Sequence, residues 1–159
     1  SGPQQKILDV LLAAHPTLAK VRCLDLRGCR ATAAGVRALG TSPHLGPVRE
    51  LDFSSTRMTE GAVRELLRWP RLPEVRSLRL ELAQLATAAA VALAECPALA
   101  DLRELHLGSN RIGAAGCLAL ARSPYLGRLS RLDLGPNSGA DNPKAKKALR
   151  ERFGKAVDW

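Results

Sequence analysis

Hydrophobic residues recur along the chain at a constant spacing of 27 positions. Three apolar columns are Val21, Val48, Val75, Leu102 and Leu129; Leu24, Leu51, Leu78, Leu105 and Leu132; and Leu26, Phe53, Leu80, Leu107 and Leu134. A proline column, Pro43, Pro70, Pro97 and Pro124, keeps the same spacing. A fixed period of this length predicts a stack of equivalent structural units.

Each unit changes its apolar period halfway, which predicts one strand followed by one helix. Residues 21–26 alternate between apolar and polar positions, as the strand period of two requires. Residues 33–39 place Val36 and Leu39 at helical spacing, directly after Thr32, which is suited to a helix N-cap. Stacking such units gives an α/β solenoid with a parallel β-sheet on the concave face and helices on the convex face.

The columns divide the chain into one domain, residues 4–159. Its expected parts are a half-unit at 4–20, full units at 21–47, 48–74, 75–101 and 102–128, and a C-terminal capping unit at 129–159. In the half-unit, a helix is expected to cover the first full unit with Ile7, Leu8, Leu11 and Leu12. In the capping unit, Asn142-Pro143 is suited to open a last helix. Residues 1–3 are typical of a cloning scar, so we expect a piece of a larger multidomain protein.

One unit carries a recognisable motif. Residues 102–116 read Leu-Arg-Glu-Leu-His-Leu-Gly-Ser-Asn-Arg-Ile-Gly-Ala-Ala-Gly, and Leu120-Ala121 follow. This pattern resembles the leucine-rich repeat family, in particular its ribonuclease-inhibitor-like subclass with the unit LxxLxLxxNxIGxxGxxxLA. The alanine- and arginine-rich composition looks like bacterial repeat proteins of this type. The resemblance implies a solenoid and a non-catalytic protein–protein interaction module, and it implies no reaction.

In this family one column of the unit is normally an asparagine that hydrogen-bonds along the stack. The column holds Asn110 and Asn137, while Cys29 and Thr56 replace the asparagine in the first two units. Ala83 stands there in the third unit and offers no side-chain hydrogen bond. We therefore expect the third unit to be the weakest joint of the stack.

Composition narrows the class of protein without naming a partner. The 159 residues are 46% hydrophobic and 25% charged, as in a folded globular domain. No apolar run approaches the roughly 20 residues of a membrane span, and the polar residues after Pro3 do not resemble a signal peptide. The cysteines Cys23, Cys29, Cys96 and Cys117 have neither disulfide-framework nor zinc-site spacing. We expect a cytoplasmic protein with reduced thiols, no metal, no cofactor and no membrane partner.

The outward-facing strand and loop residues form the candidate partner-binding surface. They are Asp25, Arg27, Glu50, Asp52, Arg57, Arg79, Glu81, Glu104, His106, Arg111, Arg131 and Asp133. Because adjacent strands lie about 4.8 Å apart, Asp52 should neighbour Arg79, and His106 should neighbour Asp133. One interpretation is a set of surface ladder pairs worth about 0–1 kcal/mol each. The other is a mixed-charge docking surface for a protein, polar because it lacks aromatic anchors.

Catalysis is not expected. A nucleophilic cysteine needs a base within about 3 Å. Cys23 and His106 are three strands apart, on the order of 14 Å. Asp133 is suited to orient His106, but no serine or cysteine occupies a matching position beside it.

The net charge of +9 suggests an alternative function. Arg22, Arg49, Arg76 and Arg103 form one column, and residues 144–155 are strongly basic. Anion or nucleic-acid binding would use these groups, although no aromatic residues interleave with them for base stacking. The other interpretation is structural, with arginine stems covering apolar surface and their charged ends in water.

The first strand, at residues 22–26, is expected to have an unpaired edge. Such an edge is a template for another chain, so a homodimer that pairs two copies of this strand is expected. The alternative is a monomer, because charged residues along a short edge discourage pairing.

Overall fold

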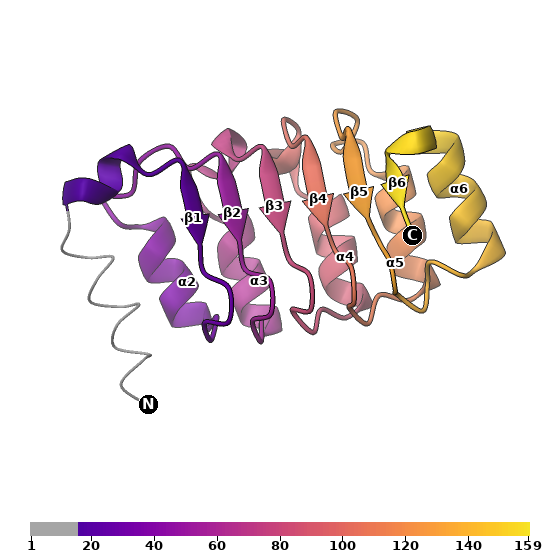
Figure 1. The fold of residues 1–159 in the computed structure, drawn as a ribbon, viewed down its shortest axis with the longest axis horizontal. Helices are drawn as coiled ribbons and strands as arrows, with labels where there is room; N and C mark the ends of the chain where they lie inside the picture. The colour runs from indigo at the N-terminus through magenta and orange to yellow at the C-terminus, as the bar shows by residue number, and fades with distance from the viewer. Residues whose placement is uncertain (1–15) are drawn as a thin grey trace.

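A computed structural model describes residues 16–159 of the chain (Figure 1). The expected N-terminal helix face at Ile7, Leu8, Leu11 and Leu12 and the expected scar at residues 1–3 lie outside the described residues. Within them, strands and helices alternate along the chain and stack side by side into a curved, one-dimensional array.

The sheet is parallel, and its strand order follows the sequence from β1 to β6. Its strands are β1 (Cys23–Asp25), β2 (Glu50–Asp52), β3 (Ser77–Arg79), β4 (Glu104–His106), β5 (Arg131–Asp133) and β6 (Val157–Asp158). From β1 to β5 the register joins residues one sequence period apart, for example Leu24 to Leu51 and Leu51 to Leu78. The α/β solenoid and its register are therefore confirmed.

Helices cover one face of this sheet (Figure 1). They are α2 (Ala33–Gly40), α3 (Glu60–Leu67), α4 (Thr87–Ala94), α5 (Ala114–Arg122) and α6 (Pro143–Phe153). Short 3-10 turns are η1 (Pro16–Lys20), η2 (Leu72–Glu74), η3 (Pro97–Leu99) and η4 (Gly154–Ala156). Thr32 caps α2 as expected, because its hydroxyl accepts the Gly35 N–H at 3.2 Å, and the equivalent Thr59 caps α3 in the same way.

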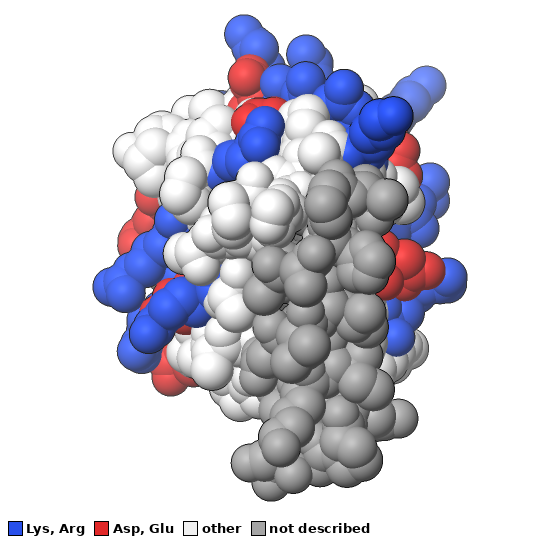
Figure 2. All heavy atoms as spheres, turned by 90° about the vertical axis from the view of Figure 1, so that its left-hand side faces the viewer, with Lys and Arg blue, Asp and Glu red and all other residues white. Residues whose placement is uncertain are grey.

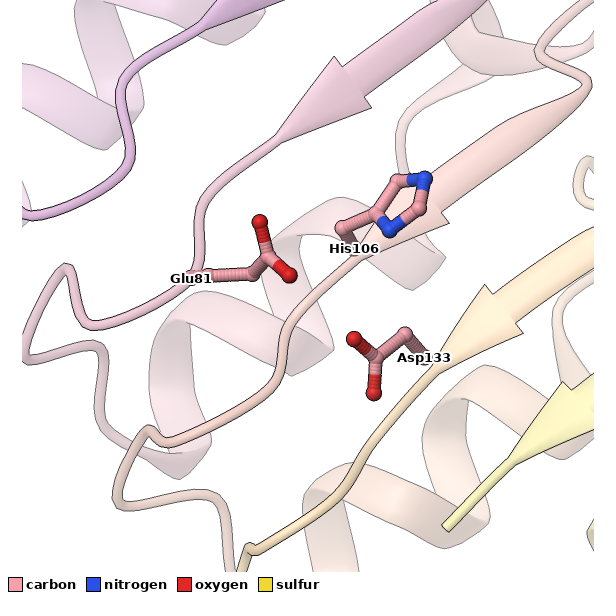
Figure 3. A group of neighbouring side chains, drawn as sticks. All are labelled: Glu81, His106 and Asp133. Carbon is pink, nitrogen blue, oxygen red and sulfur yellow. The ribbon is translucent and has the colours of Figure 1, made fainter. Parts of the chain in front are cut away.

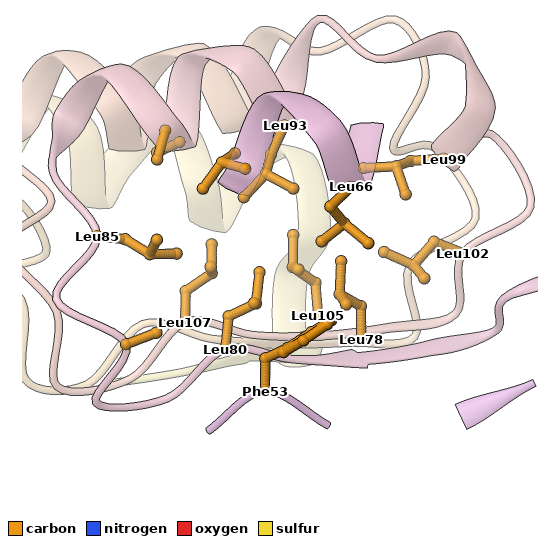
Figure 4. Packing of buried hydrophobic residues seen from close by; sticks show 14 of the residues in the cluster. Phe53, Leu66, Leu78, Leu80, Leu85, Leu93, Leu99, Leu102, Leu105 and Leu107 are labelled. Carbon is orange, nitrogen blue, oxygen red and sulfur yellow. The ribbon is translucent and has the colours of Figure 1, made fainter. Parts of the chain in front are cut away.

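The core is a row of aliphatic side chains between the sheet and the helices (Figure 4). Leu51 and Leu78 of the strands are 1% and 0% exposed, and Leu66 and Leu93 of the helices are both 0% exposed. Phe53 closes the row where strand β2 ends. Each unit buries its leucines against its neighbours, which explains why the apolar columns are uniform along the stack.

Buried asparagines tie successive turns together. Asn110 donates from Nδ2 to the carbonyls of Leu80 and Leu107, at 2.8 and 2.9 Å, and its Oδ1 accepts the Leu85 N–H at 2.9 Å. Asn137 repeats this pattern one unit later. The expected asparagine ladder is therefore present. It satisfies loop backbone groups that no helix or strand reaches.

The capping unit contains a strand that the sequence pattern does not predict. Asn142 caps α6, with Pro143 at its first turn as expected, and Leu149 is fully buried. After α6 and η4 the chain returns to the sheet, and Val157 pairs with Leu132 to form β6. This strand lies outside the 27-residue period because the stretch between α6 and β6 is shorter than the stretch between each earlier helix and the strand that follows it.

The four cysteines are free thiols in the described residues. Cys96 and Cys117 are buried, and burial raises the pKa of the Cys117 thiol to about 11. Cys23 is exposed on β1, where desolvation and the neighbouring Glu50 carboxylate raise its pKa. None of the helices in residues 16–159 is both long and apolar enough to cross a membrane.

Candidate functional site

One face of the sheet carries no layer of helices (Figure 1). Parallel sheets are usually covered on both faces, so an open face on a parallel sheet is unusual. Residues at every second strand position point to this face and line up across the strands. The register places Asp25, Asp52, Arg79, His106 and Asp133 in one row, and Cys23, Glu50, Ser77, Glu104 and Arg131 in a second row. We call this surface the strand face.

The strand register confirms that Asp52 neighbours Arg79 and that His106 neighbours Asp133, but the ion pairs on the strand face form between other residues. Arg27 binds Asp25 at 2.6 Å and lies 3.6 Å from Asp52. Hydrogen bonds from Arg27 lower the pKa of the Asp25 carboxyl to about 2. Arg131 binds Asp158 of β6 at 3.0 Å. Arginine side chains are long enough to reach beyond the residue directly opposite, so strand register alone does not fix their partners.

A hollow of about 330 Å³ lies where the strands end on the strand face. Its lining residues are Arg27, Asp52, Ser54, Ser55, Arg79, Glu81, Leu82, Gly108, Ser109, Asp133 and Gly135. Five of these residues belong to the expected binding surface, and the lining as a whole comes from five successive units. The stacking of units therefore gathers charged side chains that lie far apart in sequence into one concavity.

Leu82 is the one apolar side chain among the lining residues of this hollow, and the sequence pattern did not single it out. Leu82 is 57% exposed, in contrast to the fully buried leucines of the core. Its backbone φ is 54°, in the left-handed region that costs an L-residue about 1 kcal/mol or more. Comparison of the units could have identified Leu82. The equivalent positions in the other units are small or turn-forming residues, namely Gly28, Ser55, Ser109 and Pro136.

His106 also differs from the expectation of an exposed surface residue. It is 3% exposed, although it sits in a row of charged strand-face residues. Figure 3 shows its ring beside the carboxylates of Glu81 and Asp133, with the three side chains pointing toward one another. One ligand atom from each of the three residues lies within 4.8 Å of the other two. On the other side of the ring, Nε2 lies 3.5 Å from Glu104 Oε2.

Three other basic residues of the expected surface are exposed without partners. The guanidinium groups of Arg57, Arg79 and Arg111 have no hydrogen bond or ion pair within residues 16–159. Arg79 lines the hollow directly. Glu50 is also exposed, in the row of Glu104. The strand face therefore presents free positive charge beside its carboxylates.

The arginine column lies at the opposite end of the strands. Figure 2 views the N-terminal end of the solenoid and shows Lys and Arg side chains gathered along the top, where the strands begin, with acidic atoms among them. Arg22 donates to the Pro47 carbonyl at 3.3 Å, and Arg49 donates to the Glu74 carbonyl at 3.0 Å. Each contact joins the start of a unit to the turn at the end of the same unit, which favours the structural interpretation of this column.

Among residues 16–159, His106 is not paired with a nucleophilic side chain. In the part of the chain that the structure describes, no serine or cysteine is hydrogen-bonded to His106, and the carboxylates of Glu81, Glu104 and Asp133 lie near its ring. Acyl transfer needs a nucleophile within hydrogen-bond reach of its base. The carboxylates around the ring suit this arrangement to charge recognition or ion binding.

Comparison with known proteins gives one family match. The family model described as Leucine Rich repeat matches residues 99–121, which include strand β4 and most of helix α5. No curated protein matches the chain. The matched segment is one turn of a stack in which the neighbouring strands pair in the same register. Repeats of this kind generally mediate protein–protein interaction. The chain is therefore similar to leucine-rich repeat proteins, in sequence over residues 99–121 and in fold through the parallel sheet that alternates with helices.

Proposed function

We propose that this protein is a non-catalytic interaction module that binds a protein partner through the hollow on its strand face. The observation that carries the proposal is Leu82, an exposed leucine held at positive φ on the rim of a charged hollow. Glycine would adopt this backbone conformation without strain, as Gly28 does at the equivalent position of the first unit. Strained residues that bring no benefit to stability are typical of functional sites.

The side chains that line the hollow indicate what kind of partner would fit it. Arg79 offers a free guanidinium group beside Leu82, and Arg57 and Arg111 lie exposed on neighbouring units. Such a surface fits an acidic segment that carries one apolar side chain, the arginines binding carboxylates and Leu82 supplying the apolar contact. The expectation of a purely polar surface is thereby modified, because Leu82 provides the anchor that aromatic residues supply elsewhere.

The test uses a displayed library of random peptides selected on the unmodified protein. We expect the selected peptides to be acidic, and we expect Leu82→Gly to weaken their binding by about tenfold, or about 1.4 kcal/mol. The same substitution should leave the free energy of unfolding unchanged or raise it by up to about 1 kcal/mol, because glycine adopts positive φ without strain. Fluorescence polarisation and urea unfolding measure the two effects on the same samples.

A matched pair of charge reversals provides the control. Arg79→Glu lies on the strand face and Arg122→Glu lies on α5 at the opposite face, and both arginines are exposed without side-chain partners within the described chain. Both changes alter the net charge equally. Binding lost only in Arg79→Glu supports docking in the hollow. Binding that falls equally in both variants, or that Leu82→Gly leaves intact, contradicts it.

The alternative function, anion or nucleic-acid binding through Arg22, Arg49, Arg76 and Arg103, stays a hypothesis with less support. Arg76 donates to the Pro73 carbonyl at 2.7 Å and lies 3.5 Å from Asp101, so its charge is already used within the chain. The basic helix α6 places Lys146 4.8 Å from the ring centre of Trp159. An oligonucleotide that binds the protein at about 50 mM salt and dissociates at about 200 mM would favour the alternative.

Three finer expectations also stay proposals. The ribonuclease-inhibitor-like subclass is supported by the motif at residues 102–121. A bacterial, cytoplasmic origin within a larger protein is supported by the alanine- and arginine-rich units and the free cysteines. The homodimer is supported by the position of β1 as an edge strand among the described strands. The gene sequence, cell fractionation and light scattering at several concentrations test them in turn.

A further inference from the structure

His106 is a buried polar side chain whose hydrogen-bonding needs are not met. It is 3% exposed, and its Nε2 atom is fully buried with no hydrogen-bond partner. Its ring contacts Glu104 only at 3.5 Å, beyond the usual length of an imidazole–carboxylate hydrogen bond. Buried polar groups are nearly always paired, so an unpaired imidazole among carboxylates requires an explanation.

The strand register explains how the carboxylates converge on the ring. His106 of β4 pairs with Arg79 of β3 on one side and with Asp133 of β5 on the other. Glu81 lies two residues beyond Arg79 and therefore returns to the same face of the sheet. Figure 3 shows the ring nitrogen nearest the Cβ attachment, Nδ1, turned toward Glu81 and Asp133.

We propose that Glu81, His106 and Asp133 bind one divalent transition-metal ion, with zinc as the best match to the donors. An imidazole nitrogen and two carboxylates are ligands that zinc accepts at about 2.0–2.2 Å. Tetrahedral ligands at that distance lie about 3.4 Å apart, so the donor atoms, now within 4.8 Å, close by about an ångström on binding. The two carboxylates also balance the charge of the ion.

Polar groups on the Nε2 side of the His106 ring would support the proposed site. A metal-bound histidine usually donates its second ring N–H to a carboxylate, and Glu104 occupies that place opposite Nε2. Glu104 is itself held by the Ser77 hydroxyl, which donates to Oε2 at 3.1 Å. With zinc bound, the Nε2 proton would face Glu104 and the Nδ1 lone pair would face the ion.

The hollow gives the ion access and room. Glu81 and Asp133 both line it, and within the described chain neither has an ion pair with a basic side chain. A Cβ atom added at Gly108 would lie 3.1 Å from Asp133 Oδ2, so glycine there leaves space around that carboxylate. Spacing in the sequence predicts no metal site, because the three ligands come from three different units.

The test titrates chelator-treated protein with zinc chloride in a calorimeter. We expect one zinc ion per chain and a higher melting temperature with zinc. Glu81→Gln and Asp133→Asn, which keep side-chain size, should each weaken binding by at least tenfold, and Glu104→Gln should weaken it by roughly 10–100-fold. Glu50→Gln, an exposed strand-face carboxylate outside the cluster, is the matched control and should bind as the unmodified protein does.

An imidazole ¹⁵N spectrum of the unmodified protein keeps the proposal testable if a variant fails to fold. Zinc should shift the Nδ1 resonance of His106 while Nε2 remains protonated. Absence of stoichiometric binding, equal binding by Glu81→Gln and the unmodified protein, or a zinc-induced shift at Nε2 instead would each overturn the site. A His106 ring that is doubly protonated between its carboxylates and indifferent to zinc would overturn it as well.

Discussion

Replacing Asn110 with alanine is expected to lower the free energy of unfolding by about 3 kcal/mol or more. The side chain is buried and serves the backbone of two successive units, since it donates to Leu80 and Leu107 and accepts from Leu85. Alanine would leave these buried groups without partners, and each unpaired buried group costs about 1–3 kcal/mol. Urea unfolding followed by circular dichroism measures the change.

The control for this prediction is the neighbouring Arg111→Ala. Arg111 is exposed and its side chain has no partner within the described residues, so its removal should change stability by less than about 0.5 kcal/mol. A small effect of Asn110→Ala, similar to that of Arg111→Ala, would mean that water or a relaxed loop replaces the asparagine bonds. The asparagine ladder would then be dispensable for the stack.

The fold could be predicted because each unit repeats the same physical solution. Leu24, Leu51 and Leu78 occupy one column, and the sheet register pairs these same residues. The helix starts at Thr32 and Asn142 were also predictable, since capping depends on local sequence. Strand β6 was not predictable, because the short segment after α6 brings it to the sheet earlier than the 27-residue period requires.

The alanine at position 83 does not by itself determine how stable the third unit is. Its column lacks the asparagine amide, yet the groups nearby have other partners: the Met58 N–H binds the Ala83 carbonyl at 3.2 Å, and the Thr56 hydroxyl donates to Phe53 O at 2.6 Å. A weak third unit stays a prediction. It gains support from the helices, because α3 and α4 contact each other less extensively than the other neighbouring pairs do.

The candidate site was predictable only in part. The order of residues along the strand face follows from register alone, so Arg79, His106 and Asp133 were correctly placed beside one another. The burial of His106 was not predictable, because it depends on how Glu81 and Glu104 pack around one ring. Leu82 required comparison with the other units at a position where the family pattern itself gives no apolar signal.

Trp69 lies on the N-terminal side of the α3–α4 contact, the least extensive contact between neighbouring helices. It follows α3, it is 6% exposed, and its Nε1 donates to the Val36 carbonyl of α2 at 2.9 Å. Its ring meets Phe53 edge-on, with the ring centres 6.5 Å apart. It also covers Gly40, where an added Cβ atom would overlap the indole. One side chain therefore joins the first two full units.

Removing this side chain in Trp69→Ala is expected to destabilise the first two units by about 3–5 kcal/mol. Because a repeat contacts only its neighbours, the loss should not spread evenly along the stack. The sparse α3–α4 contact should confine it to the units that contain β1 and β2. Amide hydrogen exchange should therefore accelerate most in β1 and β2 and least in β4 and β5.

Trp159→Ala separates this expectation from a general effect of tryptophan loss. Trp159 is 40% exposed at the end of β6, where its ring lies beside Lys146 and Arg150, so its removal should leave exchange in β1 and β2 unchanged. If Trp69→Ala instead accelerated exchange equally in all strands, the solenoid would unfold as one cooperative unit. The joint between α3 and α4 would then transmit stability as well as the closer helix pairs do, and the alanine at position 83 would carry no cost.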